Sequence, residues 1–336
     1  TWVATLERLK NYIAERTEKP LVLGEAIAAD TWIRRTELLQ QVGDGRPFWL
    51  PRFVDGNQEW EDRMRTIAGP GGLQELVSES KHYALLMRKY QIETYRREVP
   101  FGGYIVSVIR DIPLCSMGLV DFLGRPKWSA ADWAWHQDTM LLLTTPDDRR
   151  SFLGGTPLTA QLAITHFADH EIEDACLKVQ LRDETAGLAK PVAKKTVSVA
   201  SAGLHEVEPL AIQLPVVTQP TRVVLEATLT SGNRSWKNVW PLWIIPRHEP
   251  RQSRVRLHES CSDEIRELFA ESATPTADSS GNIIVTGKLD ESLIDFVTDG
   301  GRLLVFPNGT TGSFPLEDQW FLRGAPFIAD HSLLHQ

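Results

Sequence analysis

Over the first 145 residues, short apolar runs alternate with stretches whose apolar residues recur at helical spacing. The runs Leu21–Gly24 and Tyr104–Ile109 predict buried strands, and residues 2–15 and 130–135 predict helices. A longer helix is predicted for residues 75–97, and it should pack across the outside of a sheet or barrel. Its expected apolar face consists of Leu76, Tyr83, Leu86, Met87, Tyr90 and Tyr95. This part of the chain therefore reads as βα repetition.

The pattern changes after Arg150 to short alternating segments separated by turn residues. The segments 158–167, 176–182, 194–199, 206–212, 222–230 and 236–245 predict a β-sandwich, which we expect to be immunoglobulin-like. From His248 onward, helices at 263–270 and 291–297 alternate with strands at 283–286 and 302–306. This predicts a second α/β region with parallel strands, and two strands are too few for a complete sheet. The predicted domains are residues 1–145, 146–247 and 248–336.

Two features of the first domain suggest chemistry. Glu25 follows the first apolar run, and a carboxylate at the C-terminal end of a strand is where an α/β barrel places its catalytic groups. The alternative is a structural ion pair or a carboxylate at the start of a helix. An irregular insert from Pro47 to Gly72 is expected to shape a substrate pocket or to form a lid, and it contains Trp49 and Trp60.

Composition excludes several classes of function. The 336 residues are 42% hydrophobic and 24% charged with a formal net charge of −8, so no basic surface for nucleic acid is expected. No apolar run reaches the roughly 18–20 residues that span a membrane. Cys115, Cys176 and Cys261 are far apart, which predicts free thiols and no disulfide framework. The histidine pairs at 166/170 and 331/335 lack supporting ligands, so neither a metal nor another cofactor is predicted.

The start of the sequence carries a further expectation. Thr1 opens the chain within a helical pattern, which suggests a piece of a longer protein. The triplets at 233–235 and 308–310 match the N-glycosylation acceptor pattern. The compartment stays open, with a periplasmic or secreted location preferred to a cytoplasmic one.

One segment carries a resemblance to a known family. The run Gly102–Pro113, followed by Gly118–Lys127, resembles the last barrel strand and following loop of glycoside hydrolase family 2, the relatives of β-galactosidase, β-glucuronidase and β-mannosidase. Pro20–Glu25 is similar to the strand that bears the nucleophile of this family. Trp240–Pro246 is similar to a strand that closes an immunoglobulin-like domain in the mannosidase branch. The order and spacing agree over residues 1 to 246.

The resemblance implies an incomplete (β/α) barrel in which Glu25 is the nucleophile of a retaining hydrolysis. The acid/base Glu would precede Thr1, so this chain alone would be inactive. Ser107 stands where many members carry a Trp, and Arg110 where they carry Asn. Arg110 either pairs with Asp111 or donates to an acidic or heavily hydroxylated sugar.

Other residues have two readings each. Trp32, Trp49 and Trp60 either stack on sugar rings or fill the core. His136 is expected to be a capping or solvated histidine.

The C-terminal region resembles class I glutamine amidotransferase-like modules, which are Rossmann-like. No Cys follows its last strand, so an accessory role is expected.

Two functions follow from these observations. The first is a retaining glycoside hydrolase, and the alternative is a non-catalytic carbohydrate-binding or interaction protein on a degenerate glycosidase scaffold. The expected partner is a carbohydrate, without nucleic acid or membrane, and homo-oligomerisation is left open.

Overall fold

The protein has a multidomain, β-rich fold that divides into two compact units, Thr1–Arg247 and His248–Gln336. The computed structural model describes residues 21–33, 58–112, 115–183, 187–247, 255–270 and 283–306, with residues 8, 10–13, 15 and 40. The backbone is described throughout residues 58–70, but the side chains of 58–60, 63, 64, 67, 68 and 70 are not.

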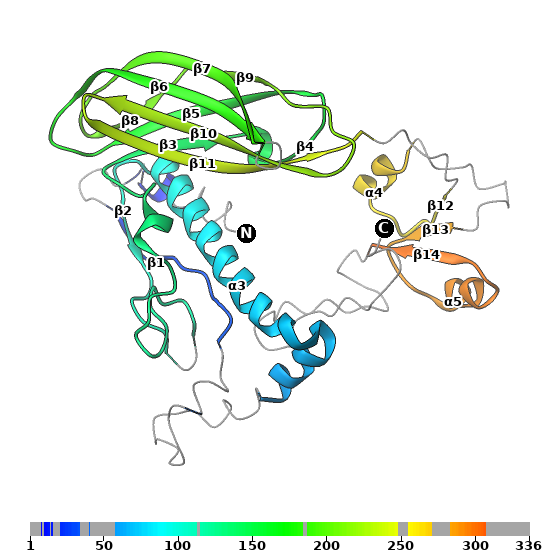
Figure 1. Ribbon diagram of the computed structural model, residues 1–336. Helices are drawn as coiled ribbons and strands as arrows, with labels where there is room; N and C mark the ends of the chain where they lie inside the picture. Colours follow the sequence, from blue (N-terminus) through cyan, green and yellow to red (C-terminus); the bar gives the residue numbers. More distant parts are fainter. Residues whose placement is uncertain are drawn as a thin grey trace. The chain divides into compact units, whose positions relative to one another are not determined.

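The first unit opens with two parallel strands, β1 (Val22–Ile27) and β2 (Gly103–Val106). Helix α3 (Gln58–Glu98) lies between them in sequence and contacts β1, β3 and β5 (Figure 1). The predicted βα alternation is therefore present as one β–α–β connection, and two strands do not define a barrel. The 3-10 helix η2 (Ala130–Trp133) occupies the position of the helix predicted at 130–135.

Helix α3 begins earlier than predicted and is bent at Gly69. The predicted irregular insert is helical from residue 58 onward, and Gly69 interrupts the helical backbone with φ 74°. Glycine adopts this left-handed conformation readily, and the following Pro70 suits the start of a new helical segment because it lacks an N–H.

The predicted apolar face of α3 was only partly right. Tyr83 is 61% exposed, whereas the fully buried positions include Ala84, Arg88, Ile92 and Tyr95. These positions follow the helical spacing, but one of them is charged. An arginine is usually expected on the solvent side of a helix. The buried face of α3 was therefore predicted at the wrong positions.

The β-sandwich follows as two mainly antiparallel sheets around one hydrophobic core (Figure 1). One sheet has the order β4 (Ser151–Leu153), β11 (Arg234–Ile245), β10 (Thr221–Ser231), β6 (Ile172–Asp183), β7 (Leu188–Val199), with β4 parallel to β11. The other contains β3 (Thr139–Thr144), β5 (Pro157–His166) and β8 (Gly203–Glu206), with β9 (Leu210–Gln213) also paired to β5. The 3-10 helix η3 (Pro146–Asp148) precedes β4.

Alternation along the strands explains this core. In β10, Val223, Leu225, Ala227 and Leu229 all lie in the core of the sandwich. β10 and β11 form a hairpin in which Ser231 pairs with Arg234, and Gly232 has φ 56°. A positive φ is typical of two-residue hairpin loops, so the turn at Gly232 and Asn233 fixes the register of both strands.

Strand β3 is buried on both faces. Leu141 and Leu143 belong to the core of the sandwich, whereas Met140 and Leu142 pack with Ile27 of β1 and Ile92 of α3 in a second cluster. β3 therefore contributes side chains to both hydrophobic cores. β3 pairs with β5, so it is the first strand of the sandwich. The sandwich therefore begins before residue 146, which was the predicted start of this domain.

A buried carboxylate on α3 joins the helix to the sandwich. Glu93, 4% exposed, accepts hydrogen bonds from Trp240 Nε1 (2.8 Å) and Asn238 Nδ2 (2.8 Å) of β11 and forms an ion pair with Lys89. Asn238 also donates to the carbonyl of Leu141 in β3 (2.7 Å). The Lys89 ammonium lies 5.1 Å from the centre of a Trp240 ring. Both carboxylate oxygens of Glu93 thus have partners within the protein.

The second unit contains a parallel sheet with the order β12 (Arg256–Leu257), β13 (Ile283–Thr286), β14 (Arg302–Val305). Helices α4 (Asp263–Leu268) and α5 (Glu291–Thr298) connect them. The parallel pairing was predicted, but the two-residue strand β12 was missed because it is too short to give an apolar pattern.

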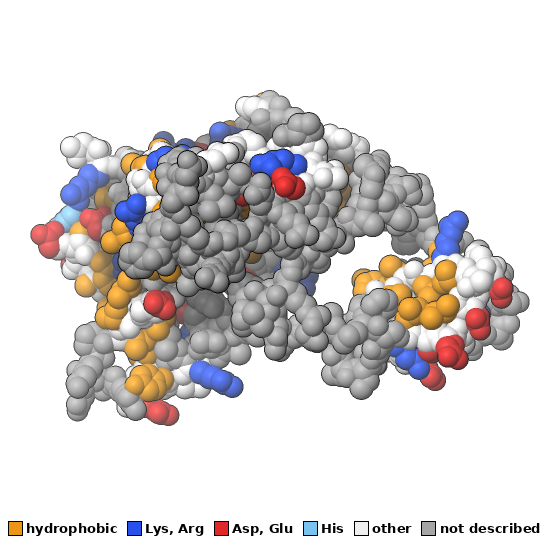
Figure 2. Space-filling view, turned by 90° about the horizontal axis from the view of Figure 1, so that it is seen from below, with side chains coloured by type: hydrophobic (Ala, Val, Ile, Leu, Met, Phe, Trp, Pro, Cys, Tyr) orange, Lys and Arg blue, Asp and Glu red, His pale blue; other side chains and the backbone are white. Residues whose placement is uncertain are grey.

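Several apolar side chains stay at the surface. Figure 2 shows hydrophobic side chains on the face seen from below. Val22 of β1 and Ile105 of β2 are 56% and 54% exposed.

Within the described residues, no helix is both long enough and apolar enough to cross a membrane.

We predict that Glu93→Ala lowers the free energy of unfolding of the first unit by about 3–5 kcal/mol, because Lys89 would be left as an unpaired buried charge. Urea unfolding followed by tryptophan fluorescence measures this change. Glu173→Ala, at an exposed position of β6, is the matched control and should unfold like the wild type. Equal stability of the E93A variant and the wild type would contradict the assignment.

Candidate functional site

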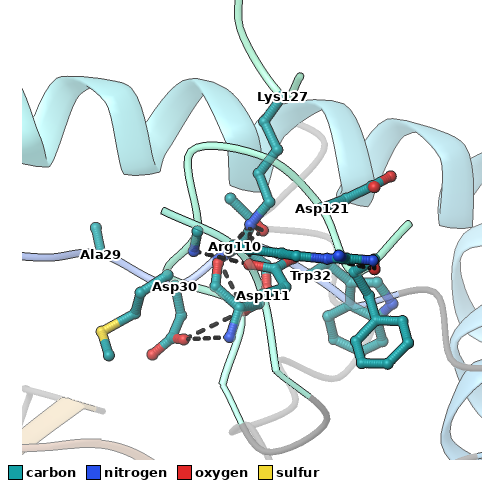
Figure 3. Close-up of polar contacts among 12 residues, drawn as sticks. Ala29, Asp30, Trp32, Arg110, Asp111, Asp121 and Lys127 are labelled. Carbon is teal, nitrogen blue, oxygen red and sulfur yellow. Dashed lines mark hydrogen bonds and ion pairs between the residues drawn. The ribbon is translucent and has the colours of Figure 1, made fainter. Parts of the chain in front are cut away.

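The candidate site lies where β1 and β2 end. The strands are parallel, so their C-terminal ends lie at the same edge, and the segments 28–33 and 107–127 leave from there. In Figure 3 the Lys127 side chain reaches toward Asp111, with Asp30 on one side and Trp32 on the other. Trp32, Arg110 and Asp111, three of the six residues predicted for the site, therefore belong to one edge.

Glu25 lies within β1 and not at its end, because the strand continues to Ile27. Leu23 pairs with Tyr104 and Ile27 with Val106, so three residues of β1 oppose Ile105 alone in an irregular pairing. Glu25 adopts φ 54° at this bulge, is exposed, and has no hydrogen-bond or ion-pair partner among the described residues. A non-glycine residue in this conformation is uncommon, and bulges redirect side chains.

Arg88 of α3 holds the two strand ends together. Its side chain is fully buried, and Nη2 donates to the carbonyl oxygens of Ser107 (3.2 Å), Ala29 (3.4 Å) and Met117. Burial lowers the pKa of Arg88, and the charge of Asp111 opposes this shift. Ser107 is itself buried, and the Ser107–Val108 peptide bond is cis.

Lys127 and Asp111 form a buried ion pair. Lys127 Nζ lies 2.7 Å from Asp111 Oδ1 and also donates to Thr31 Oγ1 (2.7 Å) and the Ser116 carbonyl (2.6 Å). The Gly118 N–H donates to the same Asp111 oxygen (2.7 Å). Burial raises the pKa of Asp111 and lowers that of Lys127, so each charge depends on the other. Asp111 therefore organises the loop through its Oδ1, which binds both Lys127 and Gly118.

The segments after β1 and β2 are also joined directly. Asp30 Oδ1 accepts from the backbone N–H (3.1 Å) and the hydroxyl (3.2 Å) of Ser116. The Thr31 N–H donates to Ser116 Oγ (3.0 Å). The candidate edge is thus a connected polar network.

Arg110 does not pair with Asp111, which corrects one of the two predicted roles. Its guanidinium donates from Nε (2.9 Å) and Nη2 (2.6 Å) to the Phe122 carbonyl, and it is exposed. Lys127 takes the place beside Asp111 instead. Neighbouring residues in an extended segment point to opposite sides, so sequence proximity did not translate into an ion pair.

The three tryptophans have different outcomes. Trp32 is half-buried, its backbone N–H donates to Ser80 Oγ of α3 (2.9 Å), and its indole Nε1 has no partner among the described residues. It lines a cavity of about 310 Å³. Trp49 lies outside the described residues, and Trp60 lies near the start of α3, where side chains are not described.

His136 belongs to an aromatic cluster and is not a free cap. Its Nε2 lies 2.6 Å from the Tyr104 hydroxyl, and its ring contacts Trp133 and Trp135, which stack on each other. Burial, and then the charge of Arg96, lower the pKa of His136.

Sequence reasoning missed Arg88, Ser116 and Lys127 as organising residues. Arg88 falls on the buried helical spacing with Ala84 and Ile92, and Lys127 ends the run that carries the resemblance. The three cysteines are free, and Cys261 is buried. Among the described residues, no three His, Cys, Asp or Glu side chains converge as a metal site would require.

We predict that Asp111→Asn and Lys127→Met each lower the free energy of unfolding by about 3 kcal/mol, because each leaves a buried partner unpaired. The double variant should lose less than the sum, with a coupling on the order of 1–3 kcal/mol. Denaturant unfolding of the four proteins measures the coupling. Additive losses would contradict a direct pair.

The lowered pKa of His136 predicts a pH dependence. The folded state favours the neutral imidazole, so its stabilising contribution is present above the usual value of 6.5 and is lost as the pH falls through the lower folded pKa. The His136 ring signal in NMR should titrate below 6.5. His136→Gln should reduce the loss of thermal stability on acidification. Titration at or above the usual value would contradict this prediction.

Comparison with known proteins adds one family match. Residues 156–246, from β5 to β11, match a family described as a domain of unknown function, DUF8488. This is less than half of the chain and covers most of the β-sandwich. A search of curated proteins found no match.

Solved structures give only distant likenesses. They include the sporulation control protein Spo0M from Bacillus subtilis, with 9% identity over 33% of this chain and 51% of that chain (TM-score 0.25). A family 123 glycoside hydrolase from Clostridium perfringens has 6% identity over 46% of this chain and 39% of that chain (TM-score 0.25). Superoxide reductase (neelaredoxin) from Ignicoccus hospitalis has 9% identity over 31% of this chain and 79% of that chain (TM-score 0.24). The match thus spans about half of Spo0M and less of the hydrolase, and such scores carry no function to this chain.

Proposed function

We propose that this chain is part of a retaining glycoside hydrolase in which Glu25 is the nucleophile. The proposal rests on the resemblance of residues 20–25, 102–127 and 240–246 to glycoside hydrolase family 2, together with the local structure at Glu25. The acid/base Glu would be supplied by residues that precede Thr1. The expected substrate is an oligo- or polysaccharide with O-glycosidic bonds.

The observation that carries the proposal is the contrast between two carboxylates. Asp111 is buried, and Lys127 and the Gly118 N–H both bind its Oδ1, so this carboxylate is committed to the loop. Glu25 is exposed, has no partner among the described residues, and lies at a bulge with φ 54°. Backbone conformations of this kind cost free energy and cluster at functional sites. An unpaired carboxylate can attack a substrate without first breaking an internal contact.

The scaffold is compatible with this assignment. The parallel pair β1–β2 with α3 between them is the repeating unit of a (β/α) barrel, and we propose that it is the end of one. We propose that the sandwich, with its two sheets around one core, is an immunoglobulin-like domain. We assign the parallel sheet β12–β13–β14 to a Rossmann-like, glutamine amidotransferase-like module with an accessory role.

The chemistry requires two carboxyl groups roughly 5–5.5 Å apart. The Glu25 carboxylate would attack the anomeric carbon while the second carboxyl group protonates the leaving oxygen. A covalent glycosyl ester forms on Glu25. The second group, now a carboxylate, then removes a proton from water, which attacks the same carbon and releases the sugar and Glu25.

One observation favours the alternative, a non-catalytic carbohydrate-binding protein. Ser107 stands where many relatives carry a tryptophan platform, and here it is buried with its carbonyl bound by Arg88. This position therefore gives no aromatic surface for a sugar. A glycosidase fold that lacks this tryptophan can still bind a sugar without hydrolysing it.

We predict that Glu25→Gln in the full-length protein lowers kcat on 4-nitrophenyl β-glycosides by about 10³-fold or more, because the covalent step is lost. The panel contains the galactoside, glucuronide and mannoside. Azide should restore turnover of Glu25→Ala, with a glycosyl azide of inverted configuration as the product. Glu75→Gln, at an exposed position of α3, is the matched control and should keep wild-type activity.

The backbone conformation at Glu25 gives a separate prediction about stability. Glu25→Gly should be as stable as the wild type or more stable by up to about 1 kcal/mol, because glycine tolerates positive φ. Inactivity of the wild type on the whole panel, or full activity of E25Q, would contradict the proposal and favour the binding alternative.

A further inference from the structure

A cavity of about 310 Å³ lies between α3 and the loop after β2, near the lower end of the roughly 300–1,000 Å³ typical of small-molecule sites. Lys81 lines it from α3, Trp32 from the segment after β1, and Phe122 and Lys127 from the loop. Glu25 is not among its lining residues. The cavity is therefore distinct from the proposed nucleophile and needs its own account.

The charges around the cavity do not cancel. Its lining contains two carboxylates, and each is paired: Asp111 with Lys127 (2.7 Å) and Asp121 with Arg125 (2.6 Å). The remaining charge is Lys81, which has no ion-pair partner among the described residues. Burial lowers the pKa of Lys127 most, and repulsion from Arg88 and then from Lys81 adds to the shift. The cavity thus carries one uncompensated positive charge, which favours a monoanion.

The uncharged lining suits a sugar ring. Trp32 and Phe122 provide aromatic surface, against which the apolar face of a pyranose can stack. Gln74 of α3 is exposed at the rim, and its amide has no partner among the described residues. An amide offers both donors and an acceptor for hydroxyl groups.

We propose that this cavity binds an acidic monosaccharide, with its carboxylate paired to Lys81, its ring against Trp32 and Phe122, and its hydroxyls bound by Gln74. The site is a binding site without chemistry of its own. It goes beyond the proposed hydrolysis and does not depend on Glu25.

The test is titration of this chain with D-glucuronate at low ionic strength, followed by backbone NMR, with D-glucose as the neutral probe. Glucuronate should bind with a Kd on the order of 1 mM and shift the signals of residues 74–81 and 121–127. Glucose should bind at least about 10-fold more weakly. Lys81→Met should weaken glucuronate binding at least about 5-fold, and Lys81→Arg should keep it within about 2-fold.

Two controls make the result decisive. Lys178→Met removes an exposed lysine from β6 and should bind like the wild type. Thermal melting of each variant establishes that it is folded. Equal binding of glucose and glucuronate, or unchanged binding by K81M, would overturn the assignment, whereas failure of the hydrolase proposal would leave these outcomes unaffected.

Discussion

The first unit depends on the buried carboxylate of Glu93. A carboxylate transferred from water to a protein interior is costly unless hydrogen bonds and a counter-charge replace its hydration. Here Trp240 and Asn238 donate from β11, and Lys89 supplies the charge from the same helix. Since these partners come from two elements far apart in sequence, the contact fixes α3 against the sandwich.

The same helix then organises the opposite side of the unit. Five residues before Glu93, Arg88 binds carbonyl groups at the ends of β1 and β2, so one helix connects the sandwich to the candidate edge. β3 reinforces the connection, because its alternate residues belong to both cores. The position of Glu25 relative to the rest of the unit is therefore set by packing and by buried charge, and its carboxylate has no hydrogen-bond or ion-pair partner among the described residues.

The sequence predicted those elements whose pattern is local. Alternation located most strands of the sandwich, and helical spacing located the C-terminal part of α3. It failed where burial depends on distant partners: Arg88 and Glu93 are charged but buried, and β3 reads as one continuous apolar run because both of its faces are covered. Within the site, the pairing of Asp111 with Lys127 spans 16 residues, and the positive φ of Glu25 has no sequence signature.

The central claim is that Glu25 becomes covalently bonded to a sugar during turnover. The most direct measurement is mass analysis of the full-length protein after incubation with 2-deoxy-2-fluoro glycosides, which slow the second step of retaining hydrolysis and accumulate the intermediate. Peptide mapping should locate one glycosyl group on the peptide that contains Glu25. A label on another carboxylate, or no label together with undetectable hydrolysis of natural glycans, would contradict the account.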